Sequence, residues 1–210
     1  MTQEDKLVAR DRILETALGL FARKGFAAVG VREIAAKAEV NLSMISYYFN
    51  GKTGILVALM EAFMDRTYAI LDKAIGRDLP PEERLRALIG DLVDFVRDAF
   101  ALTEVAFHAM PLDIPEIAER KAGHVRRILT IYSKLAHGLG LGPDDIALFT
   151  SVGPAMISII LTHFRLKDVQ AQIFGLTFDA AFYVRYKEII TTLMLDGLHG
   201  LALQPHANME

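Results

Sequence analysis

The chain has 210 residues, of which 52% are hydrophobic and 23% charged, so it can build a sizeable core and is not a disordered chain. It contains no cysteine, which excludes disulfides, thiolate catalysis and cysteine-bound zinc. The charged start MTQEDKLVARDR does not resemble a signal peptide, and the most apolar stretch, 148–164, falls short of the roughly 20 clean residues of a membrane helix. We therefore expect a cytoplasmic protein of one domain or two closely packed domains, with no membrane contact.

The net charge of −3 is divided unevenly along the chain. Residues 1–52 hold eight Lys and Arg against six Asp and Glu, a balance of +2, whereas residues 53–210 hold fifteen against twenty, a balance of −5. This asymmetry points to an anionic partner for the N-terminal segment, although a solvated face would look the same.

Helical periodicity recurs throughout the chain and the alternation typical of strands is missing, so the sequence predicts an all-α fold of about nine helices. The first helix has one apolar stripe from Ile13 to Phe21 and ends at Lys24-Gly25. Two short helices follow, 31–38 and a second that Asn41 caps and that ends near Phe49. A longer helix covers about 52–74.

The linker 76–81 separates this part from the rest. After it we expect helices over about 81–107, 116–139, 144–166 and 177–198, with a loop at 138–143 and Asp144 and Asp145 in the first turn of the helix that follows. The predicted domains are a helix-turn-helix domain over 1–54, with the motif at about 30–49, and a larger helical domain over 55–210.

The two short helices and the turn Glu39-Val40-Asn41 form a helix-turn-helix pattern. Their apolar positions pack the pair at a steep angle: Ile34, Ala35, Ala38, Val40, Ile45 and Phe49. The second helix then directs Leu42, Ser43, Ser46 and Tyr47 outward, where such a unit enters the DNA major groove. An ordinary helical hairpin has the same pattern, so the pattern alone leaves both interpretations open.

The segment 10–56 resembles the DNA-binding domain of the TetR family of transcriptional regulators. The matching positions are Ile13, Ala17, Leu20, Phe21, Gly25, Phe26, Val31, Arg32, Ile34, Ala35, Ala38, Val40, Ile45, Tyr47, Phe49, Lys52 and Ile55. They cover about a quarter of the chain, and the remainder is similar only in length and helical character.

Four residues depart from the family pattern. Gly30 stands where the family has a capping Ser or Thr, and Glu39 replaces the turn glycine, which strains the turn if that position needs a positive φ. Ser46 and Tyr48 replace a common tyrosine and histidine on the recognition helix, so the operator sequence does not follow from the resemblance.

The resemblance implies a DNA-contacting role for several residues. Leu42, Ser43, Ser46 and Tyr47 would face bases, Lys52 and Tyr47 would hold phosphates, and Tyr48 would either hold a phosphate or pack against the first helix. Met44 would lie at the rim. The full set is Arg32, Asn41, Leu42, Ser43, Met44, Ser46, Tyr47, Tyr48 and Lys52.

An enzyme is the main competing class, and its residue patterns are weak. Glu104 and His108 share a helical face, but the paired Glu-x-x-His motifs of di-iron bundles do not occur. Asp91, Asp94 and Asp98 form a charged face that is more typical of solvated surface than of catalysis. The sequence has no nucleophile elbow and no glycine-rich phosphate loop after a strand. We expect no enzyme, no cofactor and no metal.

The larger domain has the composition of an apolar pocket with few polar anchors. The candidate ligand-binding residues are Phe95, Phe100, Phe107, His108, Met110, Tyr132, Met156, His163 and Phe164. For any single one of them, plain core packing is the better explanation.

The last two helices are apolar on most sides, which indicates burial against a second copy of the chain. The candidate interface residues are Ile159, Phe182, Tyr186, Ile189 and Leu193. The family resemblance also implies a homodimer through a four-helix bundle, and burial within the monomer is the alternative.

These features together favour a homodimeric regulator that binds a double-stranded, palindromic DNA operator. The resemblance implies a repressor that a small apolar effector releases. The alternative is an all-α small-molecule sensor without DNA binding that acts through a protein partner, and an all-α enzyme ranks third.

Overall fold

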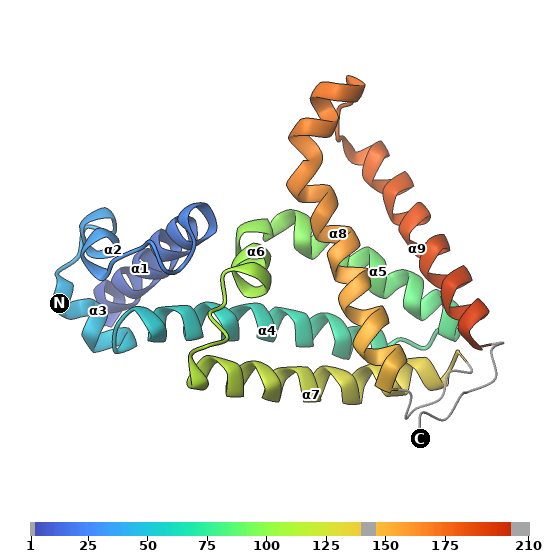
Figure 1. Ribbon diagram of the computed structural model, residues 1–210, viewed down its shortest axis with the longest axis horizontal. Coiled ribbons are helices and arrows are strands. Elements are labelled where there is room, and N and C mark those ends of the chain that lie inside the picture. Colours follow the sequence, from blue (N-terminus) through green and yellow to red (C-terminus); the bar gives the residue numbers. More distant parts are fainter. Residues whose placement is uncertain (1–2, 140–145, 203–210) are drawn as a thin grey trace. The chain divides into compact units, whose positions relative to one another are not determined.

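The computed structural model describes residues 3–139 and 146–202, and within them it confirms the all-α prediction, with nine helices and no strand (Figure 1). In the described part of the chain no helix is long and apolar enough to cross a membrane. The helices are α1 (Gln3–Lys24), α2 (Val31–Lys37), α3 (Leu42–Phe49), α4 (Lys52–Gly76), α5 (Pro81–Asp98), α6 (Phe100–His108), α7 (Pro115–His137), α8 (Ile146–Phe174) and α9 (Ala180–Ala202).

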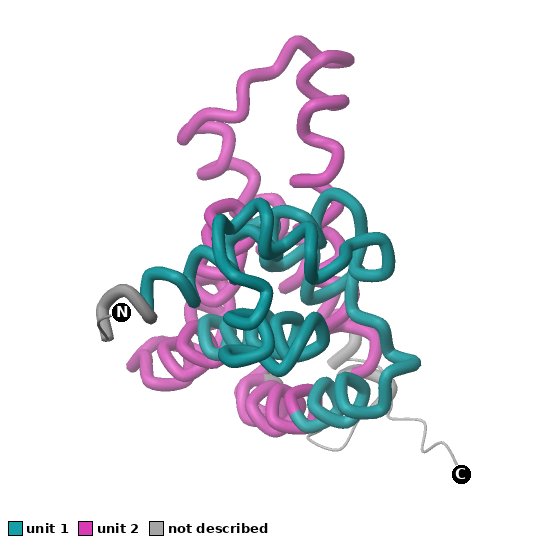
Figure 2. Tube along the Cα trace, turned by 90° about the vertical axis from the view of Figure 1, so that its left-hand side faces the viewer, with its two compact units in different colours: residues 1–67, 99–123 teal, residues 68–98, 124–210 magenta. Residues whose placement is uncertain are grey.

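The chain divides into two compact units (Figure 2). Unit 1 comprises residues 1–67 and 99–123, and unit 2 comprises residues 68–98 and 124–210. Helices α4 and α7 each run from one unit into the other. The predicted domain boundary at residue 54 falls inside α4, and as a functional division it stays a prediction.

Unit 1 is built around α1, against which α2 and α6 pack. The apolar stripe expected from the sequence is the buried side of α1: Ile13, Ala17, Leu20 and Phe21 are at most 1% exposed. The helix stops because Gly25 takes φ +76°, a conformation that glycine adopts without strain, and its N–H donates to the Phe21 carbonyl at 2.9 Å.

Unit 2 is organised around α5, which packs against α8 and α9 and buries Leu88, Ile89, Leu92, Val93 and Val96. The acidic face of α5 is held by ion pairs. Asp91 pairs with Arg77 at 2.7 Å, and Asp94 pairs with Lys187 of α9. Asp98 pairs with Arg97 at 3.0 Å.

The single helix predicted over 81–107 is wrong, because the chain breaks at Ala99. Ala99 has φ −125° and ψ 37°, and α6 starts at the next residue. The buried positions explain the break. They follow a helical stripe up to Val96, whereas Leu102 and Val105 lie off that stripe, so a straight continuation of α5 would turn these two side chains away from its buried face. Neither Gly nor Pro marks this point in the sequence.

The helices predicted at 144–166 and 177–198 are displaced in the structure. Helix α8 continues past Pro154 and Leu166 to Phe174, and α9 starts at Ala180. The stretch after Leu166 lacks Gly and Pro until Gly175, whose φ of +63° ends the helix. The expected positions of Asp144 and Asp145 lie outside the described residues.

Candidate nucleic-acid interface

Helices α2 and α3 form the expected helix-turn-helix. The residues that pack the pair are at most 6% exposed: Ile34 and Ala35 from α2, Ala38 at its C-terminal cap, and Ile45 and Phe49 from α3. The small alanine side chains allow the two helices to approach closely. This packing fixes which side of α3 remains on the surface.

Asn41 caps α3 as the sequence predicts. Its side-chain Oδ1 accepts hydrogen bonds from the backbone N–H and from the hydroxyl of Ser43, each at 3.0 Å. The backbone N–H of Ser43, in the first turn of α3, therefore has its hydrogen-bond acceptor within the protein.

The turn before Asn41 carries backbone strain. Glu39 has φ +53°, in the left-handed region that disfavours a side chain with a Cβ. The turn therefore has the positive φ that glycine adopts without strain, but the residue at this position is a glutamate.

The four outward residues predicted on α3 are exposed. Leu42 is 42% and Tyr47 72% exposed, and Ser43 and Ser46 are also on the surface. Met44 is half-buried. An exposed strip of apolar, hydroxyl and aromatic groups can contact thymine methyl groups and base edges.

Tyr48 differs from Tyr47 although the two rings touch edge to face, with centroids 4.9 Å apart. The Tyr48 hydroxyl is buried and has no hydrogen-bond partner in the part of the chain that the structure describes. This geometry favours the packing role of Tyr48 over a phosphate contact.

Lys52, at the first position of α4, is half-buried and already bound. Its Nζ donates to the Phe26 carbonyl at 2.9 Å and lies 4.1 Å from the centre of the Phe26 ring. The ammonium has two further N–H donors, but a phosphate contact by Lys52 has to share this cation with the loop between α1 and α2.

Arg32 is exposed near the start of α2, next to an ion-pair group on the same helix. Glu33 pairs with Lys24 at 2.7 Å and with Lys37 at 3.8 Å. The hydrogen bond from Lys24 holds the pKa of Glu33 below its ordinary value, with the charges of Lys24 and Lys37 adding to the effect. These pairs tie the end of α1 to α2.

Two features of this region were not identified from the sequence. The Arg10 guanidinium of α1 lies over the Phe49 ring, 5.5 Å from its centre. A Cβ on Gly54 would stand 1.5 Å from the Phe49 carbonyl oxygen, so only glycine fits at this position of α4. Glycine in the first turn of a helix is the one sequence signal for the second feature.

The candidate ligand residues are divided between the two units. Phe100, Phe107, His108 and Met110 belong to unit 1, whereas Phe95, Tyr132, Met156, His163 and Phe164 belong to unit 2. Phe107 packs edge to face on Phe63 at 5.8 Å, although Phe107 itself is 37% exposed. Burial raises the pKa of Tyr132 to about 12, and a Cβ on Gly153 would stand 3.0 Å from the Tyr132 ring.

His163 lies in an aromatic cluster between α8 and α9. Its ring centre is 4.4 Å from that of Tyr186 and 5.4 Å from that of Phe182, and the rings of Phe164, Phe178 and Tyr183 lie within 5.8 Å. Burial lowers the pKa of His163, and a hydrogen bond with Gln170 opposes this shift. The cluster joins the two predicted interface residues Phe182 and Tyr186 to His163.

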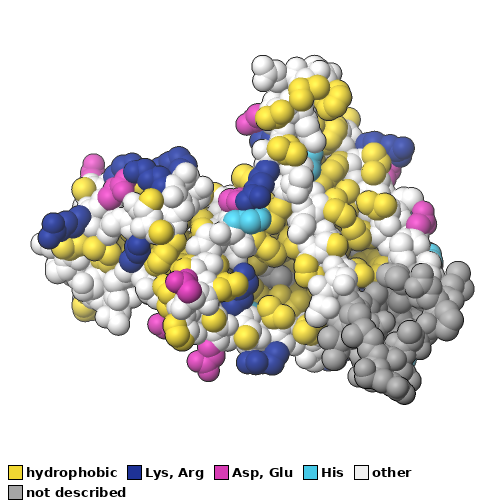
Figure 3. Space-filling model, in the orientation of Figure 1, with side chains coloured by type: hydrophobic (Ala, Val, Ile, Leu, Met, Phe, Trp, Pro, Cys, Tyr) yellow, Lys and Arg dark blue, Asp and Glu magenta, His cyan; other side chains and the backbone are white. Residues whose placement is uncertain are grey.

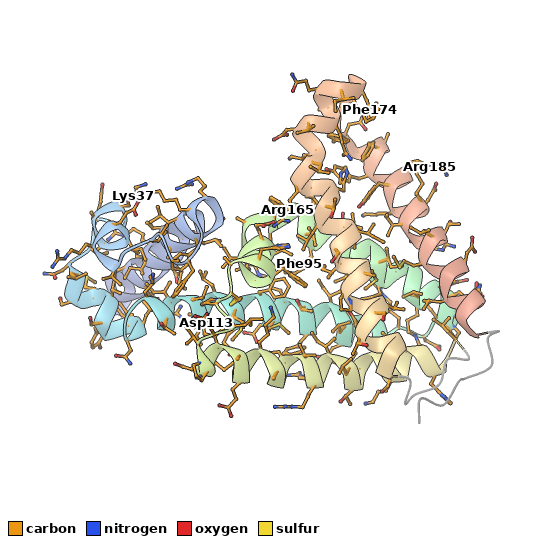
Figure 4. The ribbon with its side chains drawn as sticks, viewed as in Figure 1. Lys37, Phe95, Asp113, Arg165, Phe174 and Arg185 are labelled. Carbon is orange, nitrogen blue, oxygen red and sulfur yellow. The ribbon has the colours of Figure 1, made fainter. Side chains whose placement is uncertain are left out.

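The remaining interface candidates face outward in unit 2. Ile189 is 50% and Leu193 56% exposed on α9, whereas Ile159 is half-buried. Exposed apolar side chains continue along both helices, and Figure 3 shows hydrophobic surface over α8 and α9. They include Leu166, Val169, Ile173 and Phe174 on α8 and Val184 on α9, and Leu176 in the connection between the helices is exposed too. Figure 4 places Phe174 at the end of α8 next to the connection to α9.

Glu104 and His108 form the surface pair expected from their spacing, with Oε1 and Nδ1 3.3 Å apart. Among the described residues, no group of three or more His, Cys, Asp and Glu side chains could hold a metal ion.

Comparison with known proteins finds a family pattern in the N-terminal segment. Residues 13–59 match the pattern of "Bacterial regulatory proteins, tetR family". The chain is 34% identical over 116 residues to "Probable HTH-type transcriptional regulator YttP" of Bacillus subtilis, covering 54% of this chain and 56% of that protein. It is 32% identical over 90 residues to "HTH-type transcriptional repressor NicS" of Pseudomonas putida, covering 41% of each. The match thus spans about half the length of these curated relatives.

The fold is similar over nearly the whole chain to solved structures. One is the "transcriptional regulator FadR from Bacillus subtilis in complex with stearoyl-CoA", with a TM-score of 0.69 and 17% identity, covering 89% of this chain and 97% of that one. At this identity the likeness shows the fold, which agrees with the predicted helix-turn-helix followed by a larger helical part.

Proposed function

Because residues 13–59 match the pattern of the tetR family of bacterial regulatory proteins, we propose that this chain is a member of that family and a sequence-specific DNA-binding transcriptional regulator. One observation carries the proposal. Helix α3 is anchored on one side by Ile45 and Phe49 and presents Leu42, Ser43, Ser46 and Tyr47 to solvent on the other. A helix fixed in this way can enter the major groove without rearrangement.

The active form in this proposal is a homodimer joined through α8 and α9. The exposed apolar side chains of both helices support it, because contiguous apolar surface of this kind marks an interaction site. Two copies related by a two-fold axis would read a roughly palindromic operator in the cytoplasm.

The proposed response is release from the operator when a small apolar molecule binds within residues 85–165. FadR of Bacillus subtilis was solved with stearoyl-CoA, and NicS is named a repressor. These names support the repressor form of the proposal and a mainly apolar effector, without identifying the effector of this chain.

Selection of DNA fragments by the pure full-length chain tests the proposal. Sheared DNA from the organism of origin is incubated with the protein, and the retained fragments are sequenced. We expect enrichment of a few fragments that share an imperfect palindrome. If the retained pool matches the input pool, the chain does not read sequence, and a sensor that acts through a protein partner becomes the better account.

A further inference from the structure

We propose that Arg10 of α1 is a phosphate contact of the DNA interface, beside the C-terminal end of α3. The inference rests on the proposed function, because it adds a residue to the DNA-binding surface described above. In this proposal Arg10 helps to position the protein on the duplex and does not read bases.

The first step of the argument is the charge of the recognition helix itself. Helix α3, LSMISYYF, contains no Lys, Arg, Asp or Glu. Affinity for a polyanion comes largely from cations that neutralise phosphates. The cations that accompany α3 into the groove must therefore come from the neighbouring helices.

The second step is that several nearby cations already have partners. Lys52 donates to the Phe26 carbonyl and lies on the Phe26 ring. Lys24 and Lys37 both face the Glu33 carboxylate. The positive charges of these three lysines are therefore partly compensated by groups of the protein itself.

The third step is the position of Arg10. Its guanidinium carbon lies 5.5 Å from the centre of the Phe49 ring, and Phe49 is the last residue of α3. Ala9 and Ile13 on the same helix are at most 3% exposed, so the backbone that carries Arg10 is fixed in the core. The Arg10 side chain nevertheless remains 44% exposed.

The fourth step is the chemistry of a guanidinium on an aromatic ring. A cation close to an aromatic ring is attracted to the π-electrons and does not use its hydrogen-bond donors, so the guanidinium N–H groups remain available to phosphate oxygens. Among the described residues, Arg10 forms an ion pair only with Asp11, at 3.7 Å. Asp11 is 66% exposed, and surface pairs of this kind are weak. Arg10 is thus preorganised at the edge of α3 without being neutralised.

The experiment compares charge-changing variants of the full-length chain. Arg10→Met keeps an apolar contact with Phe49 and removes the charge, and Arg10→Lys keeps the charge. Arg12→Met is the matched control, since Arg12 is exposed and lies about 200° around α1 from Arg10. Binding to a fragment retained from the organism's DNA, and to a scrambled duplex of the same composition, is measured by fluorescence anisotropy over a series of salt concentrations.

We expect Arg10→Met to lower the affinity for both duplexes by the same factor. The slope of log affinity against log salt should become shallower by about 0.9 for each lost phosphate contact, or about two for a dimer. Arg10→Lys should retain the wild-type slope, and Arg12→Met should change it little. Thermal unfolding is measured first, and Arg10→Gln replaces Arg10→Met if the latter does not fold.

An unchanged slope for the uncharged Arg10 variant, or an equal change for Arg12→Met, overturns the assignment of Arg10 alone. A wild-type chain that binds the retained and scrambled duplexes equally overturns the proposed function and the inference together.

Discussion

Glu39 has a backbone conformation that is unfavourable for a residue with a side chain. Its φ of +53° costs a residue with a Cβ about 1 to 2 kcal/mol, whereas glycine loses about 0.5 to 1 kcal/mol in chain entropy. We expect Glu39→Gly to raise the free energy of unfolding by about 0.5 to 1 kcal/mol, measured by denaturant titration. Ala36→Gly, at an exposed position of α2, should lower it by about 0.5 to 1 kcal/mol. A loss of stability in Glu39→Gly would show that the glutamate side chain has a contact that the backbone argument omits.

His163 makes the stability of unit 2 depend on pH. Burial lowers its pKa in the folded chain below the value of about 6.5 expected after unfolding, so the unfolded chain takes up the proton more readily. The charged and titratable groups that face it are Lys167 on α8 and Tyr183 and Tyr186 on α9.

The stability linked to His163 should be complete above pH 6.5 and should fall as the pH drops below that value toward the lowered pKa. His163→Phe should remove this part of the decline in denaturant titrations over that range. A curve parallel to that of the wild-type chain would mean that His163 does not titrate between the two states.

Substitutions on α3 should change base preference, whereas a substitution at the start of α4 should change the overall affinity for DNA. Ser43 and Tyr47 are exposed on α3, so substituting either should change the preferred base at one position, by about 1 to 3 kcal/mol. Lys52→Ala should weaken binding to all duplexes and flatten the salt slope by about one unit. It should also lower thermal stability, because Lys52 holds the Phe26 carbonyl. A uniform loss in all three variants would mean that α3 is oriented differently on DNA.

The junction of α3 and α4 depends on Gly54. Because a Cβ there would lie 1.5 Å from the Phe49 carbonyl oxygen, Gly54→Ala must displace the end of the recognition helix. We expect a loss of about 3 kcal/mol or more in the free energy of unfolding, together with loss of DNA binding.

Gly123→Ala is the matched control for this substitution. A Cβ on Gly123 of α7 meets nothing within 4 Å, so the variant should be more stable by about 0.5 to 1 kcal/mol. If Gly54→Ala behaved like the control, the close approach of α4 to Phe49 would be wrong.

Elements with a clear apolar stripe and an end signal could be predicted from the sequence. The stripe of α1 with Gly25, and the cap of α3 by Asn41, both occur where expected. The break at Ala99 could not be predicted, because no Gly or Pro marks it. The end of α8 at Phe174 does have a signal, Gly175, which the prediction of a helix ending at residue 166 did not use. The contact of Arg10 with Phe49 joins residues 39 positions apart, and local periodicity carries no information on such contacts.

At the scale of the whole molecule, the apolar surface of α8 and α9 should hold two copies together. Sedimentation should give twice the chain mass of 23.3 kDa for the wild type. Leu193→Glu places a charge at a position that is 56% exposed in the single chain, and it should yield monomers. Thr130→Glu makes the same charge change on the exposed side of α7 and should remain dimeric. Dimers in both variants would place the interface elsewhere.

Helix α4 gives the molecule a covalent route for coupling, since it begins next to α3 and continues into unit 2. A ligand shifts the DNA-binding equilibrium only by its differential affinity for the two states, and a preference of about 100-fold corresponds to ~2.7 kcal/mol. We expect mainly apolar molecules that raise the melting temperature also to lower operator affinity. Stabilising ligands that all leave DNA affinity unchanged would contradict this coupling.

The central claim is that the exposed side of α3 reads a DNA sequence. The most direct measurement is the affinity of the pure chain for a duplex that it has selected, relative to a random duplex, by fluorescence anisotropy at physiological salt. A specific regulator should prefer the selected duplex by at least about 1,000-fold, with half-sites about one helical turn, ~34 Å, apart or slightly more. Equal and weak affinity for the two duplexes would contradict the claim and leave a helical sensor without DNA binding.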